Sequence, residues 1–390
     1  MTGEGTRSVH PPAPRQIAQR PLVAPIYRTS TFVFDSAQQM ADVFAGREPG
    51  WSYSRTDNPT ALAFADAVAA LEHPDAVGQA FASGAAATST VLMALLGAGS
   101  HVVAPQEVYA GTWALLTRQL ARFGVQTSFV DLTDLGAVAA AVRPETRLLW
   151  GEVLANPTMT VADLPGLSAI ARDAGIPFVV DATFASPAIC RPLEHGADLV
   201  LHSATKYLGG HSDATGGVVV GSPELMASIR QARVDLGGAL APDEAALLSR
   251  GLQTLPLRVA RQCQSALTVA TALAAHPKVE RVDYPGLPTH RDHALATQLF
   301  DAGRYGAVVT VTPYGGREAG MALLDRLRIV QRATSLGGTV SKAVHVPTTT
   351  HMSWDDAALA AAGIGAGAVR VSIGLEDAED LVEDIIQALG

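Results

Sequence analysis

A lysine that follows two hydroxyl residues offers the clearest chemistry in this sequence. Lys206 comes after Ser203 and Thr205, and Gly209 and Gly210 come just after it. A lysine amine can form a Schiff base with an aldehyde. The two hydroxyls can hold a phosphate, and the glycines leave room for a ligand. Since pyridoxal phosphate (PLP) carries both an aldehyde and a phosphate, this stretch predicts PLP as the cofactor.

A carboxylate at the end of another apolar run fits the same cofactor. Asp181 closes the run Ile176–Val180, where an unpaired carboxylate is costly to bury. The protonated pyridine nitrogen of PLP is a suitable partner, because a nearby carboxylate keeps that nitrogen charged. A helix cap or a structural salt bridge is the alternative. Lys206 follows the next predicted strand, and this favours the cofactor role for Asp181.

Five other residues are candidates for binding a phosphate. Ser83, Gly84 and Ala85 begin a predicted helix, whose free N–H groups and dipole favour an anion. Tyr53 and Arg55 lie on one face of an extended segment, and both residue types bind phosphate. Each pattern is weak alone and gains weight only beside Lys206.

Two further side chains could contact the cofactor ring and the substrate. Tyr109 comes just after a predicted strand, where it could stack on a ring and move protons, or simply pack. Arg370 interrupts the apolar residues of another predicted strand and needs an anionic partner if it is buried. A substrate α-carboxylate would be a bidentate partner, with a structural carboxylate as the alternative. Glu152 and Asn156 mark one more strand end and turn.

Most of these residues fall at strand ends in an alternating strand and helix pattern. The strands are continuous apolar runs, which is typical of a mostly parallel sheet covered on both faces. Ligands collect at the carboxyl ends of such strands. Asn58-Pro59 predicts a turn, with Thr60 as the cap of the next helix. The predicted strands cover residues 101–105, 126–131, 147–153, 176–181, 198–202 and 217–220, and the predicted helices cover 60–71, 85–96, 112–123 and 164–174.

A second, smaller α+β unit is predicted after helices over 243–255 and 256–275. Its strands cover residues 279–284, 307–312 and 368–373, and its helices cover 318–327 and 378–389. The expected division is an N-terminal arm (1–57), a large PLP-binding domain (58–256) and a small C-terminal domain (257–390). The arm lacks a sustained helical period and would bury little by itself, so we expect it to contact a neighbouring subunit.

Composition and charge narrow the possible classes of function. The 390 residues suit two domains, and the net charge of −9 argues against nucleic acid as a partner. No apolar run reaches the roughly 20 residues that span a bilayer, and the N-terminus lacks the apolar region of a signal peptide. Cys190 and Cys263 form no disulfide framework, so a cytoplasmic setting is expected. The pattern of His290, Asp292 and His293 is too weak to predict a metal site.

The chain resembles the Cys/Met-metabolism PLP enzymes of the aspartate-aminotransferase fold (fold type I). This family includes cystathionine γ-synthase, cystathionine γ-lyase, methionine γ-lyase and O-acetylhomoserine sulfhydrylase. The resemblance runs from about residue 21 to 390. It rests on Tyr53-Ser54-Arg55, Asn58-Pro59-Thr60, Ala82-Ser83-Gly84, Val108-Tyr109, Glu152, Asn156-Pro157, Asp181, Thr183-Phe184, the Lys206 stretch, Arg250-Gly251-Leu252, Ser335-Leu336-Gly337-Gly338 and Arg370-Val371-Ser372-Ile373-Gly374-Leu375-Glu376-Asp377.

The resemblance implies a role for each candidate residue. Lys206 would hold PLP and move protons, Asp181 would pair with the pyridine nitrogen, and Tyr109 would stack on the ring and assist the leaving group as an acid. Arg370 would hold the substrate carboxylate with Asn156 and Ser335. Further cofactor contacts would come from Ser83, Gly84, Ala85, Thr183, Ser203 and Thr205, and from Tyr53 and Arg55 of the neighbouring subunit. The family implies active-site-sharing dimers paired into a tetramer.

The chain departs from the family at positions that line the mouth of the substrate site. Val340 replaces the usual Glu, and Lys342 replaces an apolar residue. Gly111 replaces the Cys of methionine γ-lyases, and Val234 replaces a Lys, so methionine γ-lyase activity is disfavoured. The expected activity is γ-replacement or γ-elimination on a homoserine ester, a cystathionine-like substrate or a nonstandard γ-substituted L-amino acid. The alternatives are an aminotransferase and a catalytically inactive PLP-binding regulatory protein.

Overall fold

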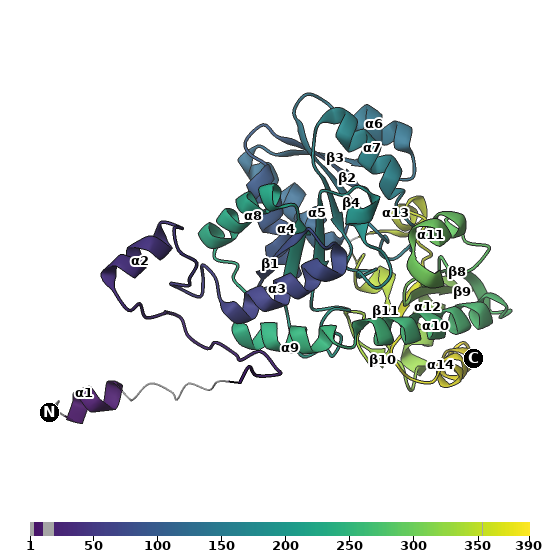
Figure 1. The fold of residues 1–390 in the computed structure, drawn as a ribbon. Helices are drawn as coiled ribbons and strands as arrows, with labels where there is room; N and C mark the ends of the chain where they lie inside the picture. The colour runs from purple at the N-terminus through teal and green to yellow at the C-terminus, as the bar shows by residue number, and fades with distance from the viewer. Residues whose placement is uncertain (1–3, 11–18, 353) are drawn as a thin grey trace.

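Two β-sheets organise the chain. The computed structural model describes residues 4–10, 19–352 and 354–390. A seven-stranded sheet with helices on both faces is followed by a five-stranded sheet with its own helices (Figure 1). The predicted α/β class, with a mostly parallel sheet and a smaller second unit, is therefore confirmed.

The larger sheet has the strand order β1-β7-β6-β5-β4-β2-β3. The neighbours from β6 to β3 run parallel, whereas β7 runs antiparallel to both β1 and β6. Strands β2, β6 and β7 are almost fully buried, which explains their continuous apolar sequences. The strands are β1 (Val77–Phe81), β2 (His101–Pro105), β3 (Gln126–Val130), β4 (Thr146–Glu152), β5 (Phe178–Asp181), β6 (Leu199–Ser203) and β7 (Gly217–Gly221). Strand β1 was not among the predicted strands.

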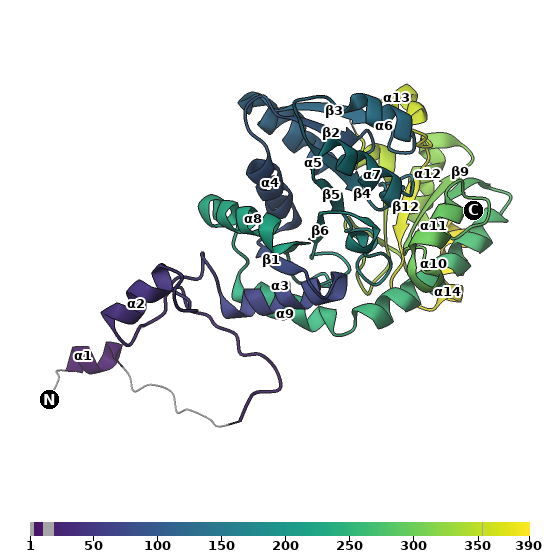
Figure 2. The same cartoon turned by 45° about the horizontal axis from the view of Figure 1, so that its top comes forward.

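Helices cover both faces of the larger sheet and form two apolar cores. Successive residues of a strand point to opposite faces, so Val179 and Val180 of β5 enter different cores. Helices α4 and α8 lie side by side on one face (Figures 1 and 2), and α3, α7 and α9 cover the other face. The bounds are α3 (Pro59–Glu72), α4 (Gly84–Leu95), α6 (Leu135–Ala141), α7 (Leu164–Ala174), α8 (Pro223–Leu236) and α9 (Pro242–Leu252).

Two predictions about the helices next to this sheet were wrong. Asn58, not Thr60, caps α3: its side chain accepts a hydrogen bond from the Thr60 backbone N–H at 2.9 Å, and Pro59 is the first helical residue. The predicted helix 112–123 is three short segments. They are α5 (Ala110–Ala114), the π-helical turn η1 (Leu115–Gln119) and the 3₁₀ turn η2 (Leu120–Phe123).

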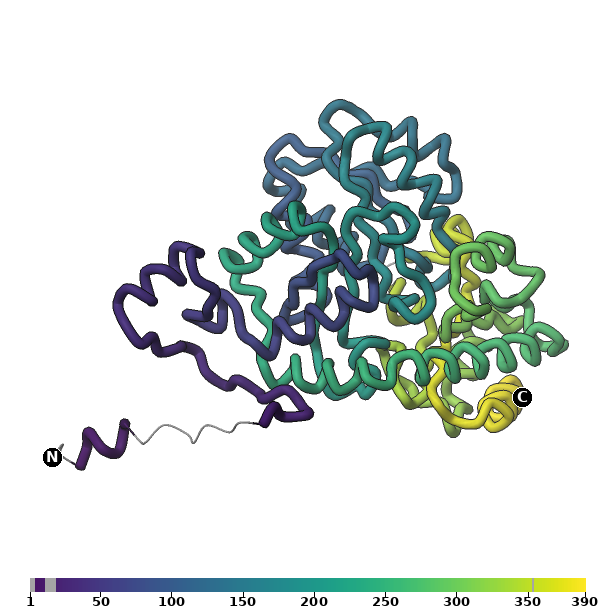
Figure 3. The backbone as a smooth tube through the Cα atoms, in the orientation of Figure 1, coloured from purple at the N-terminus to yellow at the C-terminus, as the bar shows by residue number. Residues whose placement is uncertain are grey.

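The smaller sheet has the order β10-β11-β12-β9-β8 and is antiparallel except at β10–β11. Its strands are β8 (Val279–Asp283), β9 (Val308–Pro313), β10 (Gln331–Arg332), β11 (Lys342–His345) and β12 (Val369–Ser372). The long helix α10 runs from the larger sheet along the smaller one (Figure 3). The helices of this part are α10 (Leu255–Ala274), α11 (His293–Leu299), α12 (Gly316–Arg326), α13 (Asp356–Ala361) and α14 (Ala378–Ala388).

The N-terminal arm projects away from both sheets (Figures 2 and 3). It contains two short helices that the sequence did not predict, α1 (Glu4–Val9) and α2 (Ala37–Phe44). Residues 1–3 and 11–18 of the predicted arm lie outside the described residues. Leu22 and Val33 are 103% and 99% exposed, so the arm leaves apolar side chains uncovered in the single chain. Within the described part of the chain, no helix combines the length and apolarity needed to cross a membrane.

Candidate active site

A cavity of about 830 Å³ opens at the carboxyl ends of β4, β5 and β6, where the two sheets meet. Its wall includes the last residues of these strands or the turns that follow them, as expected for a mostly parallel sheet. Ten predicted site residues line it together: Gly84, Ala85, Tyr109, Asn156, Asp181, Thr183, Ser203, Lys206, Ser335 and Arg370. The structure thus brings together residues that lie up to 286 positions apart in the sequence.

Lys206 stands in the turn after β6 and points at the loop before β11. Its Nζ donates a hydrogen bond to Ser335 Oγ at 2.8 Å. Burial lowers the pKa of the Lys206 amine, and the charges of Arg370 and Lys342 lower it further. A lower pKa increases the neutral fraction of the amine, and only the neutral amine can attack an aldehyde.

Asp181 and Thr183 form a hydrogen-bonded turn at the end of β5. Asp181 Oδ1 accepts from the Thr183 backbone N–H at 2.9 Å, and Thr183 Oγ1 accepts from the Ser203 backbone N–H at 2.8 Å. Burial raises the pKa of the Asp181 carboxyl. Among the described residues, no lysine or arginine forms an ion pair with it. A pyridinium nitrogen would supply the missing cation, so the carboxylate fits PLP.

The start of α4 forms a cradle that only a glycine permits. A Cβ built on Gly84 would lie 2.7 Å from Ser203 Cβ, so the absent side chain lets the helix end approach β6 closely. Gly84 and Ala85 are the first two residues of the 12-residue helix α4, and both line the cavity. Their backbone N–H groups have no partner within the helix. This arrangement suits a phosphate group.

Two predicted phosphate ligands use their hydroxyls elsewhere. Ser83 Oγ accepts from the Ala86 backbone N–H at 3.0 Å and caps α4. Thr205 Oγ1 donates to Gly216 O at 3.3 Å and accepts from Gly216 N–H at 3.1 Å. Neither residue lines the cavity in this chain. Their side chains position the backbone around the cradle.

Arg370 lines the cavity and has one buried donor without a partner among the described residues. It is 6% exposed, and its Nη1 donates to Asn156 Oδ1 at 2.9 Å while its Nη2 donates to Ser335 O at 3.2 Å. Its Nε is buried without a hydrogen-bond partner in the described structure. Burial lowers the pKa of the guanidinium to about 10. A buried cation with a free donor is suited to a carboxylate ligand.

Tyr109 is held by Glu152, whose role the sequence did not assign. The Tyr109 backbone N–H donates to Glu152 Oε1 at 2.8 Å, while the phenol ring is 53% exposed. Burial, followed by the charge of Asp181, raises the pKa of Glu152 well above its usual range. A Cβ on Gly111 would lie 2.5 Å from Tyr109 Cε1, so this ring position requires the glycine. In the sequence, Glu152 was marked by its position at a strand end and by the family resemblance, and neither gave it a role.

Besides Ser83 and Thr205, four further predicted site residues lie outside this cavity: Tyr53, Arg55, Val340 and Lys342. Arg55 stacks 5.7 Å from the Tyr53 ring centroid and donates from Nη1 to Val234 O at 2.8 Å, within the arm and α8 region. Lys342 Nζ donates to Ser212 Oγ at 2.6 Å, and Val340 is half-exposed. Conversely, the cavity is also lined by polar residues that have no role assigned from the sequence, among them Ser89, Arg118, Gln119, Thr334 and Thr350. Their polarity in sequence is ordinary, so no local pattern marked them.

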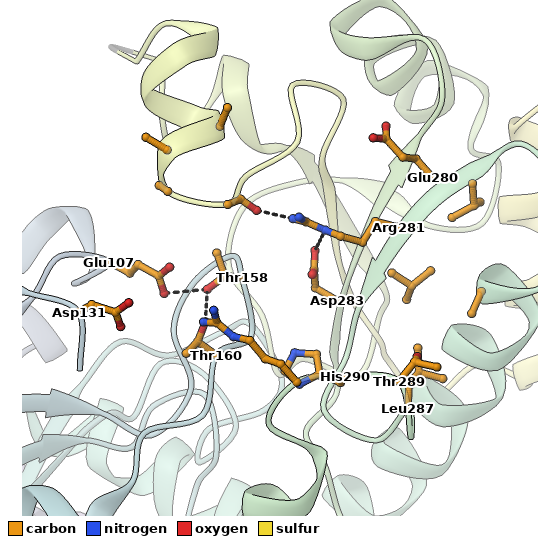
Figure 4. A pocket seen from close by; sticks show the side chains of 18 of the residues that line it. Glu107, Asp131, Thr158, Thr160, Glu280, Arg281, Asp283, Leu287, Thr289 and His290 are labelled. Atoms are coloured by element: carbon orange, nitrogen blue, oxygen red, sulfur yellow. Dashed lines mark hydrogen bonds and ion pairs between the residues drawn. The ribbon is translucent and has the colours of Figure 1, made fainter. Parts of the chain in front are cut away.

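A second cavity, of about 620 Å³, lies between the two sheets and is separate from Lys206 (Figure 4). Glu107 accepts from Thr158 Oγ1 at 2.8 Å on one wall, and Arg281 Nε donates to Asp283 Oδ2 at 3.0 Å on the other. Burial raises the pKa of Asp283 to about 6. No lysine or tyrosine occurs among the described residues that line this cavity.

The described residues contain no cluster of three or more histidine, cysteine or acidic side chains that could hold a metal ion. The histidines considered above make local hydrogen bonds. His290 Nδ1 accepts from the Asp292 backbone N–H at 3.2 Å, and His293 Nδ1 lies 2.7 Å from Pro285 O.

Comparison with known proteins identifies the family. A family model described as Cys/Met metabolism PLP-dependent enzyme matches residues 5–390. The chain is 43% identical to an L-methionine gamma-lyase of Pseudomonas putida, over 100% of this chain and 98% of the relative. It is 40% identical to a cystathionine gamma-synthase of Mycobacterium tuberculosis (strain CDC 1551 / Oshkosh), over 100% and 97% of the two chains.

Solved structures agree with this comparison. A putative O-acetylhomoserine (thiol)-lyase from Campylobacter jejuni superimposes with a TM-score of 0.92 at 30% identity, over 98% of this chain and 99% of that one. That crystal structure contains a pyridoxyl-lysine phosphate. A cystathionine gamma-lyase from Lactobacillus plantarum gives a TM-score of 0.87 at 36% identity, over 93% and 92% of the chains.

The matches cover the whole of the cavity, and its residues fit the cofactor that these proteins share. The amine of Lys206, the unpaired carboxylate of Asp181 and the Gly84 cradle match the aldehyde, the pyridine nitrogen and the phosphate of PLP. The chain therefore belongs to the Cys/Met metabolism family of PLP-dependent enzymes, and pyridoxal phosphate is its cofactor.

Proposed function

We propose that this PLP-dependent γ-lyase or γ-synthase acts on a γ-substituted L-amino acid. The expected substrates are a homoserine ester, a cystathionine-like compound or a nonstandard γ-substituted amino acid. The supporting observation is that the Lys206 amine and the buried Arg370 guanidinium, with its free Nε, face one cavity. Bound PLP supplies an electron sink that acidifies the Cα and then the Cβ protons, which allows a γ-substituent to leave.

Each of several cavity residues has its own proposed role in this reaction. Arg370, supported by Asn156 and Ser335, binds the substrate carboxylate and so orients Cα toward Lys206. Lys206 removes the Cα proton and moves protons at Cβ. Tyr109 stacks on the ring and donates a proton to the γ-leaving group. The family membership and the common cavity support these proposed roles.

Preference for a homoserine ester over methionine is proposed from Gly111. The similarity to both L-methionine gamma-lyases and cystathionine gamma-synthases, at 43% and 40% identity, does not separate the two activities. A side chain at position 111 would collide with the Tyr109 ring in its present position. An enzyme with Cys at this position must hold Tyr109 differently, so we expect slow methionine elimination here.

The test is an assay of the holoenzyme with four substrates. O-acetyl-L-homoserine, O-succinyl-L-homoserine, L-cystathionine and L-methionine are supplied with and without L-cysteine. Thioether formation reports replacement, and 2-oxobutanoate reports elimination. Lys206→Ala is the inactive control. Turnover of methionine faster than of every other substrate would contradict the proposed preference, and silence with all four would leave only the nonstandard substrates.

An aminotransferase and an inactive PLP-binding regulatory protein are the remaining alternatives. An aminotransferase would accumulate pyridoxamine phosphate when an amino acid is added without a keto acid. A regulatory protein would bind PLP at Lys206 and turn over no amino acid. The relatives named above are lyases and synthases, which favours the main proposal.

We further propose that two copies of the chain share each active site and that such dimers pair into a tetramer. Tyr53 and Arg55 lie away from the cavity of their own chain, and the arm that carries them has exposed apolar residues. A reducing cytoplasmic location is also proposed, since Cys190 and Cys263 are both free thiols in the buried core. Nucleic acid is not an expected partner, because the net charge is −9.

A further inference from the structure

We propose that Arg233 is a positioning residue for the cofactor site. It holds the segment 53–57 in the conformation that presents Tyr53 and Arg55 to a neighbouring subunit. This inference rests on the proposed sharing of active sites between two copies of the chain. It adds a residue that neither lines the Lys206 cavity nor belongs to a motif considered above.

The helix α8 carries a charge where its sequence pattern predicts an apolar residue. Its buried residues are Met226, Ile229 and Arg233, whose spacing of three and four residues places them on one face of the helix. Met226 and Ile229 belong to an apolar core, whereas Arg233 is 3% exposed and extends the same face. Burying an arginine is costly unless its donors find partners, so the contacts of Arg233 indicate its role.

The partners of Arg233 are three consecutive residues at the end of the N-terminal arm. Its Nη1 donates a hydrogen bond to Arg55 O at 3.2 Å, and its Nη2 donates to Thr56 O and, at 3.2 Å, to Asp57 Oδ1. Two of these acceptors are backbone carbonyls, so the bonds fix the path of the chain as well as one side chain. A guanidinium has several donors in one rigid plane, which a lysine cannot reproduce.

The side chains of Tyr53 and Arg55 remain exposed on this anchored segment. Arg55 Cζ lies 5.7 Å from the Tyr53 ring centroid. Within the described residues, Arg55 Nη1 has a hydrogen-bond partner, Val234 O at 2.8 Å, and the other Arg55 donors have none. The backbone is thus fixed to α8, while a phenol and most donors of a guanidinium are available to another molecule.

Stability alone does not explain why Arg233 is buried. Its Nε is buried without a hydrogen-bond partner in the described structure, and burial lowers the pKa of its guanidinium. Its carboxylate partner, Asp57, is shared with the exposed Arg230. Replacing a buried ion pair with apolar residues of similar volume is often neutral for stability. Such a residue at position 233 would fill the face of α8 but would leave Arg55 O and Thr56 O without their anchor.

The first test compares PLP affinity in Arg233→Met, in Tyr53→Phe/Arg55→Ala and in the variant that combines them. Visible absorbance after dilution of each holoenzyme reports the release of PLP and gives the dissociation constant. Losing a charge-assisted hydrogen bond to the phosphate should raise this constant by roughly tenfold or more in Arg233→Met. If Arg233 acts through Tyr53 and Arg55, the combined variant should bind PLP no more weakly than Tyr53→Phe/Arg55→Ala. Additive losses would overturn the inference.

Arg230→Met is the matched control for this comparison. It removes the same charge from the same helix, but Arg230 is exposed and contacts the Asp57 carboxylate rather than a backbone carbonyl. Exposed ion pairs contribute little, so we expect less than about a twofold change in PLP affinity. Arg233→Lys keeps the charge without the planar fork, so it should also weaken PLP binding, and it provides the measurement if Arg233→Met does not fold. Wild-type affinity in a folded Arg233 variant would overturn the inference.

A second test shows which subunit Arg233 serves. Coexpression of Lys206→Ala with Tyr53→Phe/Arg55→Ala should give mixed dimers in which one chain supplies Lys206 and the other supplies Tyr53 and Arg55. Adding Arg233→Met to the Lys206→Ala chain should lower their activity at limiting PLP by roughly tenfold, because that chain supplies the segment 53–57. The same substitution in the other chain, whose segment is already altered, should have a much smaller effect. The reverse order of effects would overturn the inference.

Failure of the proposed sharing has a different signature. If coexpression of the two inactive chains restores no activity while Arg233 is intact in both, each chain completes its own site and the sharing fails. The comparison of PLP affinities then decides whether Arg233 positions Tyr53 and Arg55, since that measurement does not depend on which subunit receives them.

Discussion

At the residue scale, burial and charged neighbours lower the pKa of Lys206, the lysine proposed to bind PLP. Burial is the largest cause of the lowered Lys206 pKa, followed by Arg370 and Lys342. Arg370 would bind a substrate carboxylate, whereas Lys342 Nζ donates a hydrogen bond to the Ser212 hydroxyl. Lys342 acts on Lys206 before the substrate arrives. The family resemblance places an apolar residue at position 342. Lowering of the Lys206 pKa by a charge at this position is therefore expected in this chain and not in members that carry the apolar residue.

Replacing Lys342 should change the reactivity of Lys206 in the apoenzyme. Lys342→Leu removes a positive charge that lowers the pKa of Lys206, so that pKa should rise. The neutral fraction of the amine at pH 7 falls accordingly, and PLP should react more slowly. The measurement is the pH profile of the PLP association rate, which should move to higher pH. Lys278→Leu, at an exposed lysine, is the control; identical profiles for Lys342→Leu and wild type would refute the coupling.

At the element scale, short helical segments around the sheet edge determine the ligand contacts. The N-terminus of α4 lies against β6 because Gly84 has no side chain. The π-helical turn η1 directs Arg118 to the same cavity. Both features depend on how a helix meets its neighbour rather than on the helix sequence alone.

Adding one methyl group at the start of α4 should weaken cofactor binding. The Cβ of Gly84→Ala would lie 2.7 Å from Ser203 Cβ, and this clash must move α4 or β6. Overpacking of this kind costs typically 1–3 kcal/mol, so PLP affinity should fall by roughly tenfold or more. Equilibrium titration of the apoenzyme with PLP measures this effect. Gly97→Ala, which would meet nothing within 4 Å, should bind PLP normally.

The strand β8 carries a carboxyl group that should make stability depend on pH. Burial raises the Asp283 pKa from 3.8 to about 6, despite its pairing with Arg281. The folded state then binds this proton more tightly than the unfolded state, so its contribution to stability falls as the pH rises from about 4 to about 6. Asp283→Asn removes this titrating group, so the variant should lose less stability between about pH 4 and about pH 6. The Tm of the variant minus the Tm of wild type should therefore increase with pH across that range.

Thermal unfolding from pH 4 to pH 8 measures this difference. Asp131→Asn removes a more exposed carboxylate from the wall of the same cavity and serves as the control. A Tm difference between Asp283→Asn and wild type that is constant across the range would show that the carboxyl group titrates normally.

At the scale of the whole molecule, the single chain leaves apolar residues of its N-terminal arm exposed. The arm extends away from both sheets (Figure 3) and exposes apolar side chains. Tyr53 and Arg55 do not line the cavity of their own chain. A second subunit would cover the arm and receive these two residues. The division into an arm (1–57), a large domain (58–256) and a small domain (257–390) stays a prediction.

Shared active sites predict complementation between two inactive variants. The double variant Tyr53→Phe/Arg55→Ala and the variant Lys206→Ala each damage a different half of the site. Coexpressed in equal amounts, they should form mixed dimers in which one of two sites is intact, giving about a quarter of wild-type activity. Activity no greater than that of the separate variants would mean that each chain completes its own site.

The sequence by itself determined the chemistry and the order of the elements. Apolar runs and turn residues act locally, so the strands that end at Asp181 and before Lys206 were predicted within a few residues. The arm helices, β1 and the broken helix after Tyr109 were missed, because their signals are short or depend on packing. The ten residues of the cavity were recognised through ordered motifs along nearly the whole chain.

Only the tertiary structure decided where polar atoms point. It turned the Thr205 hydroxyl to the Gly216 backbone and Lys342 to Ser212, and it left Arg370 Nε without a partner. It also directed Arg118, which no motif marks, into the cavity. The physical reason is that residue type fixes which bonds a side chain can form, whereas the packing of distant segments fixes which partners come within reach.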